Sequence, residues 1–216
     1  MNRVIHRCDQ RSDEWFALRA GRFTASQAAD MLATVKSGEA AARRNLRTRL
    51  IVERLTCKPI PSSYQSKAMV QGVEREPLAR AAYESLTGNL VDEIGFISSA
   101  EYMVGCSPDG VELDGERVKR VIELKCPEPT AHLEYIRTGE MPSGYRAQVV
   151  HALWVSGAEV CDWMSYNPDF PAEMQTVLIR VERHEGEIRA YSEKALEFLA
   201  EVDNEMRELR ERIGVR

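Results

Sequence analysis

The stretch VIELKCP, residues 121–127, places two opposite charges inside what otherwise reads as a buried β-strand. Alternate residues of a strand face the same side, and one face here is apolar, comprising Ile122, Leu124 and Cys126. Val121, Glu123 and Lys125 share the other face, where an apolar set would be more stable because buried charges are costly unless they are paired or bind a metal. The strand therefore predicts either a Glu–Lys ion pair on a half-exposed face or a pair of functional charges.

The hydrophobic pattern changes near residue 88, and this change predicts the fold class. Before it, apolar residues recur at helical spacing over about 12–20, from 24–26 onward, over 39–57 and over about 66–87, where Pro77 is expected to bend or interrupt the helix. After it, LVDEIGFIS, YMVGC and VKRVIELKC are typical of neighbouring antiparallel strands. A helix over 144–156, two more strands and a long C-terminal helix complete an α/β (α+β) chain with a central mixed β-sheet flanked by helices.

Length and composition indicate one domain. The 216 residues are 44% hydrophobic, enough to bury a sizeable core, and no linker, repeat or low-complexity tract divides them. We expect residues 1–216 to form a single domain in which a mostly helical part, 1–88, packs on a sheet core, 89–216. The most apolar stretch, around 147–158, is too short and too polar to span a bilayer, so we expect a cytoplasmic location.

The net charge of −5 is unevenly distributed along the chain. Residues 1–60 carry 12 Lys and Arg against 6 Asp and Glu, and the densest basic run is ARRNLRTRLIVERL, residues 42–55. Such a stripe can neutralise DNA phosphates whatever the overall charge. A solvated helix face is the alternative, and the run taken alone favours it.

A third charged residue, Asp109, lies in the turn SPDG at the end of the preceding strand. Thirteen residues separate it from Glu123, enough for a turn and a return along an adjacent strand, so we expect the two carboxylates to meet. Two neighbouring carboxylates suit Mg²⁺, which prefers oxygen ligands and keeps part of its hydration shell. The main-chain oxygen of Leu124 is a further candidate ligand, and we expect Lys125 to orient or help deprotonate the attacking water.

Other chemistries lack their motifs. The four histidines show no metal-binding spacing, the five cysteines contain no C-x-x-C pair, and neither a P-loop motif nor G-x-S-x-G is present. These patterns argue against a zinc site, ATP hydrolysis and a serine hydrolase.

The spacing of Asp109, Glu123 and Lys125 is that of the PD-(D/E)xK nuclease superfamily, and further motifs accompany it. WFALRAGRFTASQAADML, VQGVEREPLARAAYESLTG, GCSPDG, IELKCP and YRAQVVHALWVSGAEVCDWMSYNP follow one another along the chain. In this order and approximate spacing they resemble the lambda exonuclease-like family, also called YqaJ-like viral recombinases. The resemblance runs from about Trp15 to Tyr166 and, more loosely, to the C-terminal helix, and it implies a restriction-endonuclease-like core.

The resemblance also implies roles for individual residues. Asp109 and Glu123 look like the family's metal-binding carboxylates, with the backbone oxygen of Leu124 as a further ligand, and Lys125 looks like the catalytic lysine. Glu76 resembles a helical glutamate that faces a second metal site or its water, with Glu74 as the alternative register. Gln148 resembles the glutamine that reaches into the site from the following helix.

A second group resembles the family's site for the 5′-phosphate of DNA. Arg19 looks like the arginine that grips this phosphate, with Ser26 and Ser107 as its hydrogen-bonding companions. An arginine suits the role because its planar fork binds phosphate oxygens bidentately. Lys36 stands where lambda exonuclease itself has an arginine, and it keeps the charge but loses the fork.

The implied activity is that of a Mg²⁺-dependent exonuclease that degrades one strand of linear double-stranded DNA from a 5′-phosphorylated end. It would release 5′-mononucleotides in the 5′-to-3′ direction and leave a 3′ single strand. One or two Mg²⁺ ions are expected, for which Mn²⁺ can substitute. The implied partners are DNA ends, a single-strand annealing protein and two further copies in a homotrimeric ring, in the cytoplasm of a bacterial host of a phage or prophage and without a membrane.

Two other functions stay open at this point. One is a structure-selective or restriction-type endonuclease of the same superfamily. The other is an inactive DNA-binding accessory protein of recombination. Intact Asp109, Glu123 and Lys125 argue against the second, because an inactive descendant has no reason to keep all three.

Overall fold

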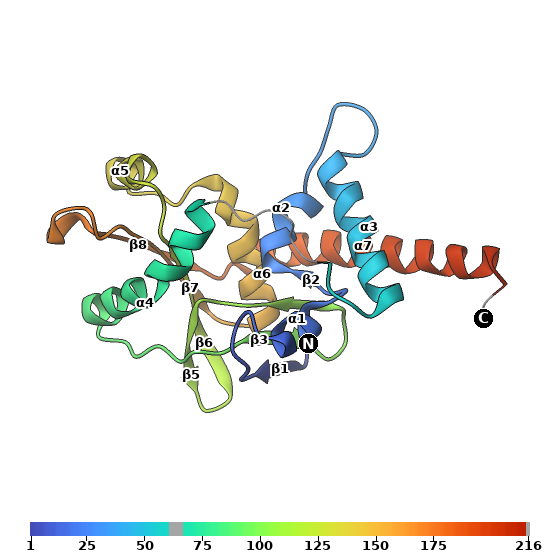
Figure 1. Ribbon diagram of the computed structural model, residues 1–216, viewed down its shortest axis with the longest axis horizontal. Coiled ribbons are helices and arrows are strands. Elements are labelled where there is room, and N and C mark those ends of the chain that lie inside the picture. The colour runs from blue at the N-terminus through green and yellow to red at the C-terminus, as the bar shows by residue number, and fades with distance from the viewer. Residues whose placement is uncertain (61–66, 215–216) are drawn as a thin grey trace.

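The computed structural model describes residues 1–60 and 67–214, drawn in Figure 1. The helices in these ranges are α1 (Asp13–Arg19), α2 (Ala28–Met31), α3 (Ala41–Thr56), α4 (Lys67–Thr87), α5 (Pro129–Thr138), α6 (Arg146–Ser156) and α7 (Glu185–Arg212). The strands are β1 (Arg3–His6), β2 (Phe23–Thr24), β3 (Phe96–Ser99), β4 (Val104–Cys106), β5 (Gly110–Asp114), β6 (Arg117–Lys125), β7 (Val160–Tyr166) and β8 (Thr176–Glu182). None of the helices described is long and apolar enough to cross a membrane.

The strands form two mixed four-stranded sheets. The first has the order β1-β3-β4-β2, in which only the β4–β2 pair is parallel. The second has the order β5-β6-β7-β8, in which only the β6–β7 pair is parallel. Strand β6 is therefore an interior strand, and its residue Glu123 lies opposite Trp163 of β7.

The predicted α/β fold class with mixed sheet and flanking helices is confirmed, but the strands divide between two sheets instead of one. Residues 1–88 are mostly helical, and they also supply β1 and β2 to the first sheet. Helix α4 continues through Pro77 without an interruption, and Figure 1 shows that it is bent along its length. The hydrophobic pattern did not reveal β1, which is short and half exposed, or α5, which begins at Pro129.

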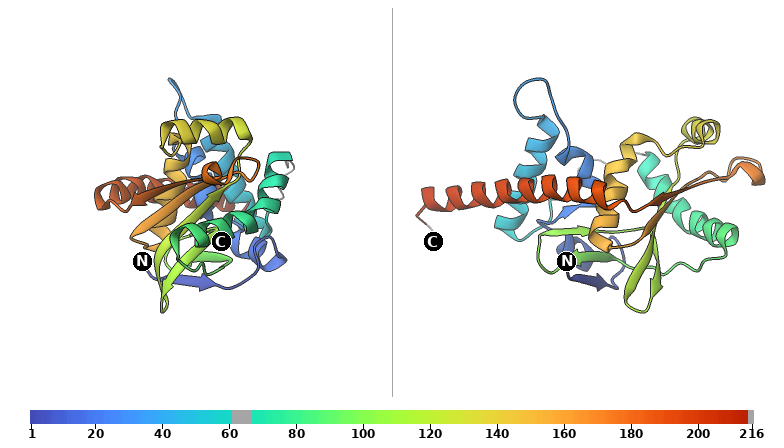
Figure 2. Two further views of the ribbon diagram at one scale, coloured as in Figure 1. Left: turned by 90° about the vertical axis from the view of Figure 1, so that its left-hand side faces the viewer. Right: turned by 180° about the vertical axis from the view of Figure 1, so that it is seen from behind.

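Helix α6 lies in the core between the two sheets and contacts both of them. Every residue from Val149 to Ser156 is buried. Apolar side chains surround the helix because it contacts β3 and β4 of the first sheet, β6 and β7 of the second, and α7. Figure 2 shows α7 running past α6 and α3 along the back of the molecule. This packing joins the two sheets and places the first turn of α6 beside β6.

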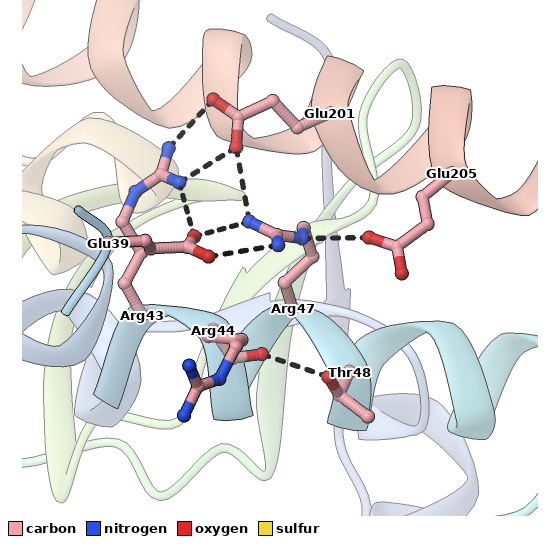
Figure 3. A network of polar contacts seen from close by, with 7 residues as sticks. All are labelled: Glu39, Arg43, Arg44, Arg47, Thr48, Glu201 and Glu205. Carbon is pink, nitrogen blue, oxygen red and sulfur yellow. Dashed lines mark hydrogen bonds and ion pairs between the residues drawn. The ribbon is translucent and has the colours of Figure 1, made fainter. Parts of the chain in front are cut away.

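Two arginines of the basic run in α3, Arg43 and Arg47, are paired within the protein, as Figure 3 shows. Arg43 contacts both Glu39 and Glu201, and its two terminal nitrogens each lie 2.8 Å from a carboxylate oxygen of Glu201. Arg47 also pairs with Glu39, and its Nε lies 2.8 Å from Glu205 of α7. Neither a phosphate-binding stripe nor a solvated helix face describes these two arginines, because acidic residues of the same chain neutralise them.

Two further side chains of α3 hold the turn that follows α1. Glu53 is buried and accepts hydrogen bonds from the Gly21 amide at 2.9 Å and from Arg49 Nε at 2.9 Å. Arg54 donates to the Gly21 carbonyl at 2.8 Å and pairs with Asp203 of α7. Gly21 has φ +69°, and a Cβ there would lie 2.6 Å from Arg54 Cγ, so only glycine fits.

A buried histidine lies where α6, α7 and the first sheet meet. His151 Nε2 is 3.0 Å from the Gly105 carbonyl oxygen, and Nδ1 is 2.8 Å from the Tyr191 hydroxyl. A carbonyl oxygen only accepts, so Nε2 carries the proton and Nδ1 accepts from Tyr191. Burial lowers the pKa of His151 to about 3, which keeps the ring neutral at neutral pH.

We predict that acid destabilises the fold through His151. The unfolded chain protonates this residue below its ordinary pKa of 6.5, whereas the folded chain holds it neutral down to about pH 3. The loss of stability therefore begins below pH 6.5 and reaches about 2 kcal/mol at pH 5. Urea denaturation at pH 7.5 and pH 5 measures it. The loss between the two pH values should be about 2 kcal/mol smaller in His151→Asn than in the wild type, and equal losses would contradict the prediction.

Candidate active site

Strand β6 presents its charged face to α6 and its apolar face to α4. Ile122 and Leu124 pack in a cluster with Tyr83 of α4, as the alternation of the sequence predicts. Val121, on the other face, belongs to the main core around α6. Glu123 shares that face and is only 2% exposed, so its carboxylate needs compensation from its neighbours.

Two side chains supply this compensation. Lys125 Nζ lies 3.1 Å from Glu123 Oε2, and Gln148 Nε2, in the first turn of α6, donates to the same oxygen at 2.7 Å. Lys125 also lies over the ring of Tyr145, 5.6 Å from its centroid, a neighbour that the sequence analysis did not identify. The predicted convergence of Glu123, Lys125 and Gln148 is therefore present in the structure.

Asp109 joins this group from the segment between β4 and β5. Its amide donates to the Ile122 carbonyl at 3.1 Å, and its Oδ2 accepts a 2.7 Å hydrogen bond from the Leu124 amide. These two bonds seat the aspartate against β6. Its Oδ2 lies 3.9 Å from Lys125 Nζ, so the ammonium group is close to both carboxylates.

The charges of this group are strongly coupled. Burial raises the pKa of Glu123 to about 7, Lys125 opposes that rise, and Asp109 adds to it. Burial alone would lower the pKa of Lys125, but the attraction of Glu123 and Asp109 outweighs it and raises the pKa above its usual value. Lys125 is therefore a cation at neutral pH.

Glu76 of α4 faces Asp109 from the other side. Burial and the negative charge of Asp109 raise the pKa of Glu76, while Arg11 and Arg80 oppose the rise. Arg80 Nη2 lies 3.3 Å from Glu76 Oε1 and 3.4 Å from the Asp109 carbonyl oxygen. Glu74, the alternative register, is exposed. The structure thus brings Glu76, and not Glu74, to the carboxylates.

The donor set of this site fits a hard divalent cation. In the described part of the chain, no three Asp, Glu, His or Cys side chains form a ready-made metal-binding group. Asp109 and Glu123 nevertheless face one cationic group together, and Asp109 is bonded to the Leu124 peptide. These ligands are all oxygen atoms, and with water or phosphate completing the shell they suit Mg²⁺.

A separate group surrounds the guanidinium of Arg19. Its Nη1 donates to Ser107 Oγ at 2.8 Å, and its Nη2 lies 3.4 Å from Thr24 Oγ1. The carbon of the guanidinium lies 4.2 Å from the ring centroid of Trp15, whose indole N–H also donates to Ser107 Oγ at 2.9 Å. Burial lowers the pKa of Arg19 to about 10, so the side chain keeps its charge at neutral pH.

Only part of this group could be expected from the sequence. Trp15 precedes Arg19 by four residues, the spacing at which side chains on one helix face meet, and this signal could have identified the pair. Ser26 lies in a short 3₁₀ turn and is exposed. The contact with Arg19 that was expected of Ser26 is made by Thr24. Lys36 is exposed in the loop between α2 and α3. The structure brings Arg19 and Ser107 together but places neither Ser26 nor Lys36 in hydrogen-bonding contact with them.

The fold is that of known exonucleases. Two crystal structures of LHK-Exo, an alkaline exonuclease from Laribacter hongkongensis, are 36% identical to this chain, with TM-scores of 0.84 and 0.82, and one of them contains dAMP. The similarity covers 94% of this chain and 98% of each LHK-Exo chain. A phage-related exonuclease from Haemophilus somnus 129PT shares the fold at 12% identity, with a TM-score of 0.65 over 87% of this chain and 96% of that one.

The family model of the YqaJ-like viral recombinase domain matches residues 14–159. The chain therefore belongs to the YqaJ-like viral recombinase family, as its motifs indicated. No curated protein matches it.

We predict that Gln148→Glu destabilises the fold when divalent ions are absent. The substitution replaces the amide that donates to Glu123 Oε2 with a second carboxylate. Like charges at this distance should cost about 2–3 kcal/mol at pH 8, and less at pH 5, where one carboxylate takes up a proton and restores the hydrogen bond. Urea denaturation in EDTA at both pH values measures the effect.

Gln148→Met is the matched control, because it removes the hydrogen bond without adding charge. It should cost about 1 kcal/mol at pH 8, and its pH dependence between pH 5 and pH 8 should be smaller than that of Gln148→Glu. Equal stability of Gln148→Glu and Gln148→Met at pH 8 would show that position 148 does not face the Glu123 carboxylate.

Proposed function

We propose that this protein is a Mg²⁺-dependent 5′-to-3′ exonuclease that degrades one strand of linear double-stranded DNA from a 5′-phosphorylated end. One observation carries the proposal. Asp109, Glu123, Lys125 and Gln148 converge on one edge of β6 in a chain that shares 36% identity with a solved exonuclease over 94% of its length. The comparisons support a nuclease, and the chemistry of these residues supports the finer assignment.

In the proposed reaction, water attacks the phosphorus of a phosphodiester and the P–O3′ bond breaks. The products are a 5′-mononucleotide and a shortened strand with a new 5′-phosphate, and the departing O3′ takes up a proton. Asp109, Glu123 and the Leu124 main-chain oxygen would hold Mg²⁺, as one ion or two, and the bound metal would supply Lewis acidity towards the phosphodiester. Mn²⁺ shares the required ligand preference.

Lys125 acts in this reaction as a cation. A protonated ammonium has three N–H donors and no lone pair, so it orients the attacking water and offsets charge on the phosphate in preference to removing a proton. Gln148 holds the Glu123 carboxylate in position. Glu76, whose pKa is raised beside Asp109, is the proposed contact for a second ion or its water.

Arg19 is the proposed contact for the terminal 5′-phosphate. Trp15 and Ser107 hold its guanidinium in one orientation before any ligand binds, which lowers the entropy lost on binding. Ser26 and Lys36 are proposed as secondary DNA contacts from their exposed positions. The family resemblance further supports a homotrimeric ring around DNA and cooperation with a single-strand annealing protein, in the cytoplasm of a bacterium that carries the phage or prophage.

The first test is release of mononucleotides from a linear duplex. Wild-type protein with Mg²⁺ should release 5′-mononucleotides from a 5′-phosphorylated duplex and leave 3′ single strands. Lys125→Ala should lower kcat by at least about a hundredfold, and Asp109→Ala should abolish release, because each removes a group that acts on the reacting phosphate. Chromatography of the products measures the rates.

Covalently closed circular DNA separates this proposal from its main rival. An exonuclease leaves the closed circle intact, whereas an endonuclease of the same superfamily nicks or linearises it. Cutting of the circle by wild type, with loss of cutting in Asp109→Ala, would replace the proposal with the endonuclease. Equal products from wild type, Lys125→Ala and Asp109→Ala would overturn the catalytic assignment altogether.

A second prediction concerns the choice of DNA end. Arg19→Lys keeps the charge but loses the planar fork, so it should reduce the preference for 5′-phosphate over 5′-hydroxyl ends, measured as a ratio of kcat/KM, by about tenfold. Arg22→Lys is the matched control, because Arg22 lies in the same segment and contacts main-chain oxygens of other residues. An unchanged ratio in Arg19→Lys would remove Arg19 from the terminal-phosphate site.

A further inference from the structure

A cavity of about 310 Å³ opens beside the two carboxylates Glu76 and Asp109. The segment between β1 and α1 forms one wall of it with Arg7, Gln10 and Arg11, and α4 forms another. A larger hollow of about 580 Å³ lies between α2, α3 and α7 and includes neither Glu76 nor Asp109. The smaller cavity is therefore the one that reaches these two carboxylates.

The segment between β1 and α1, which carries Arg11, is fixed by hydrogen bonds within itself and to the loop that precedes Asp109. Ser12 donates twice to the Asp9 carbonyl oxygen, from its hydroxyl at 2.7 Å and from its amide at 3.2 Å, and closes a tight turn. Gln10 Nε2 donates to the Pro108 carbonyl at 2.8 Å, and Pro108 directly precedes Asp109. The backbone of the turn thus moves with the loop that carries the catalytic aspartate.

Arg11 has an unusual backbone conformation in this turn. Its φ is +69°, in the left-handed region that residues other than glycine, asparagine and aspartate rarely adopt. Its side chain is half exposed, and its closest carboxylate contact is a 3.5 Å approach of Nη2 to Glu76 Oε2. A half-exposed ion pair at that distance returns little stability, so the arginine costs the fold more than it contributes.

Arg80, the other cation beside Glu76, is held more tightly than Arg11. It is largely buried and contacts Glu76, Glu93 and the Asp109 carbonyl oxygen together. Its role is structural, since both of its terminal nitrogens contact protein acceptors. Arg11 lines the cavity and has five N–H donors, of which, among the described residues, only Nη2 has a contact, to Glu76, so most of its donors are available to a ligand.

We propose that Arg11 binds a backbone phosphate of the DNA strand that occupies this cavity, and that the Glu76 contact is its position in the DNA-free protein. The proposal rests on the proposed nuclease function and extends it by a phosphate contact separate from the Arg19 group. A strand whose scissile phosphate lies at Asp109 and Glu123 must continue past the site, and Arg11 and Arg7 are the exposed cations on the cavity wall. When Arg11 binds a phosphate, its contact with Glu76 breaks, and the Glu76 carboxylate can then face the reaction site.

The left-handed backbone conformation of Arg11 allows its side chain to be removed without straining the fold. Arg11→Gly removes the guanidinium and places at this position the residue that best tolerates φ +69°, so the variant should be at least as stable as the wild type. It should raise KM for a 5′-phosphorylated duplex about tenfold, and the dependence of log KM on log salt should become shallower by about one unit, as expected when one phosphate contact is lost. Arg11→Lys should recover most of both effects, because it restores the charge.

The outcomes separate this proposal from the proposed function. If wild-type protein releases no nucleotides, the nuclease assignment fails. If the wild type is active and Arg11→Gly matches it in KM and salt dependence, the phosphate contact fails and the nuclease stands. A fall in kcat with unchanged KM and salt slope also overturns the contact, since Arg11 would then act on Glu76 alone. Arg11→Asn, which also tolerates this backbone conformation, repeats the measurement if the glycine variant folds poorly.

Discussion

The buried carboxylate of Glu123 is the constraint on which the rest of the site depends. A carboxylate with 2% exposure is costly unless charge and hydrogen bonds compensate for it, and here Lys125 and Gln148 both contact its Oε2. Gln148 can do so because α6 packs closely on β6, and α6 is buried on every side from Val149 to Ser156. The packing of this buried helix therefore positions the amide that contacts the Glu123 carboxylate.

Both faces of β6 contribute to the same site. Its charged face meets α6, while Ile122 and Leu124 on its apolar face pack against α4, which carries Glu76. Tyr83, two turns further along α4, is fully buried, and its hydroxyl donates to the buried Asp162 of β7 at 2.8 Å. This anchor sets the rotation of α4, and with it the side from which Glu76 meets Asp109.

The sequence predicted the parts of the site that follow from local periodicity. Alternation along β6 placed Glu123 and Lys125 on one face, and the spacing to Asp109 predicted that a hairpin would return it to β6. Periodicity could not predict contacts between segments far apart in the chain. One partner of Arg43, Glu201 of α7, lies 158 residues away, and Ser107, which contacts both Trp15 and Arg19, lies about ninety residues from them. The division into two sheets likewise depends on which strands pair, which no single segment encodes.

The distribution of charge has a consequence for where DNA can bind. The basic excess of residues 1–60 suggested the α3 run as the phosphate-binding surface, yet Arg43, Arg47 and Arg54 neutralise acidic residues of α7. Those arginines stabilise the attachment of the C-terminal helix and are not available to phosphates without breaking it. The cations proposed to contact DNA come instead from the segments around α1, where Arg11 lines the cavity beside Asp109 and the guanidinium of Arg19 is held by Ser107. Under the proposed function, a few positioned arginines would therefore take the place of a broad basic surface in this acidic protein.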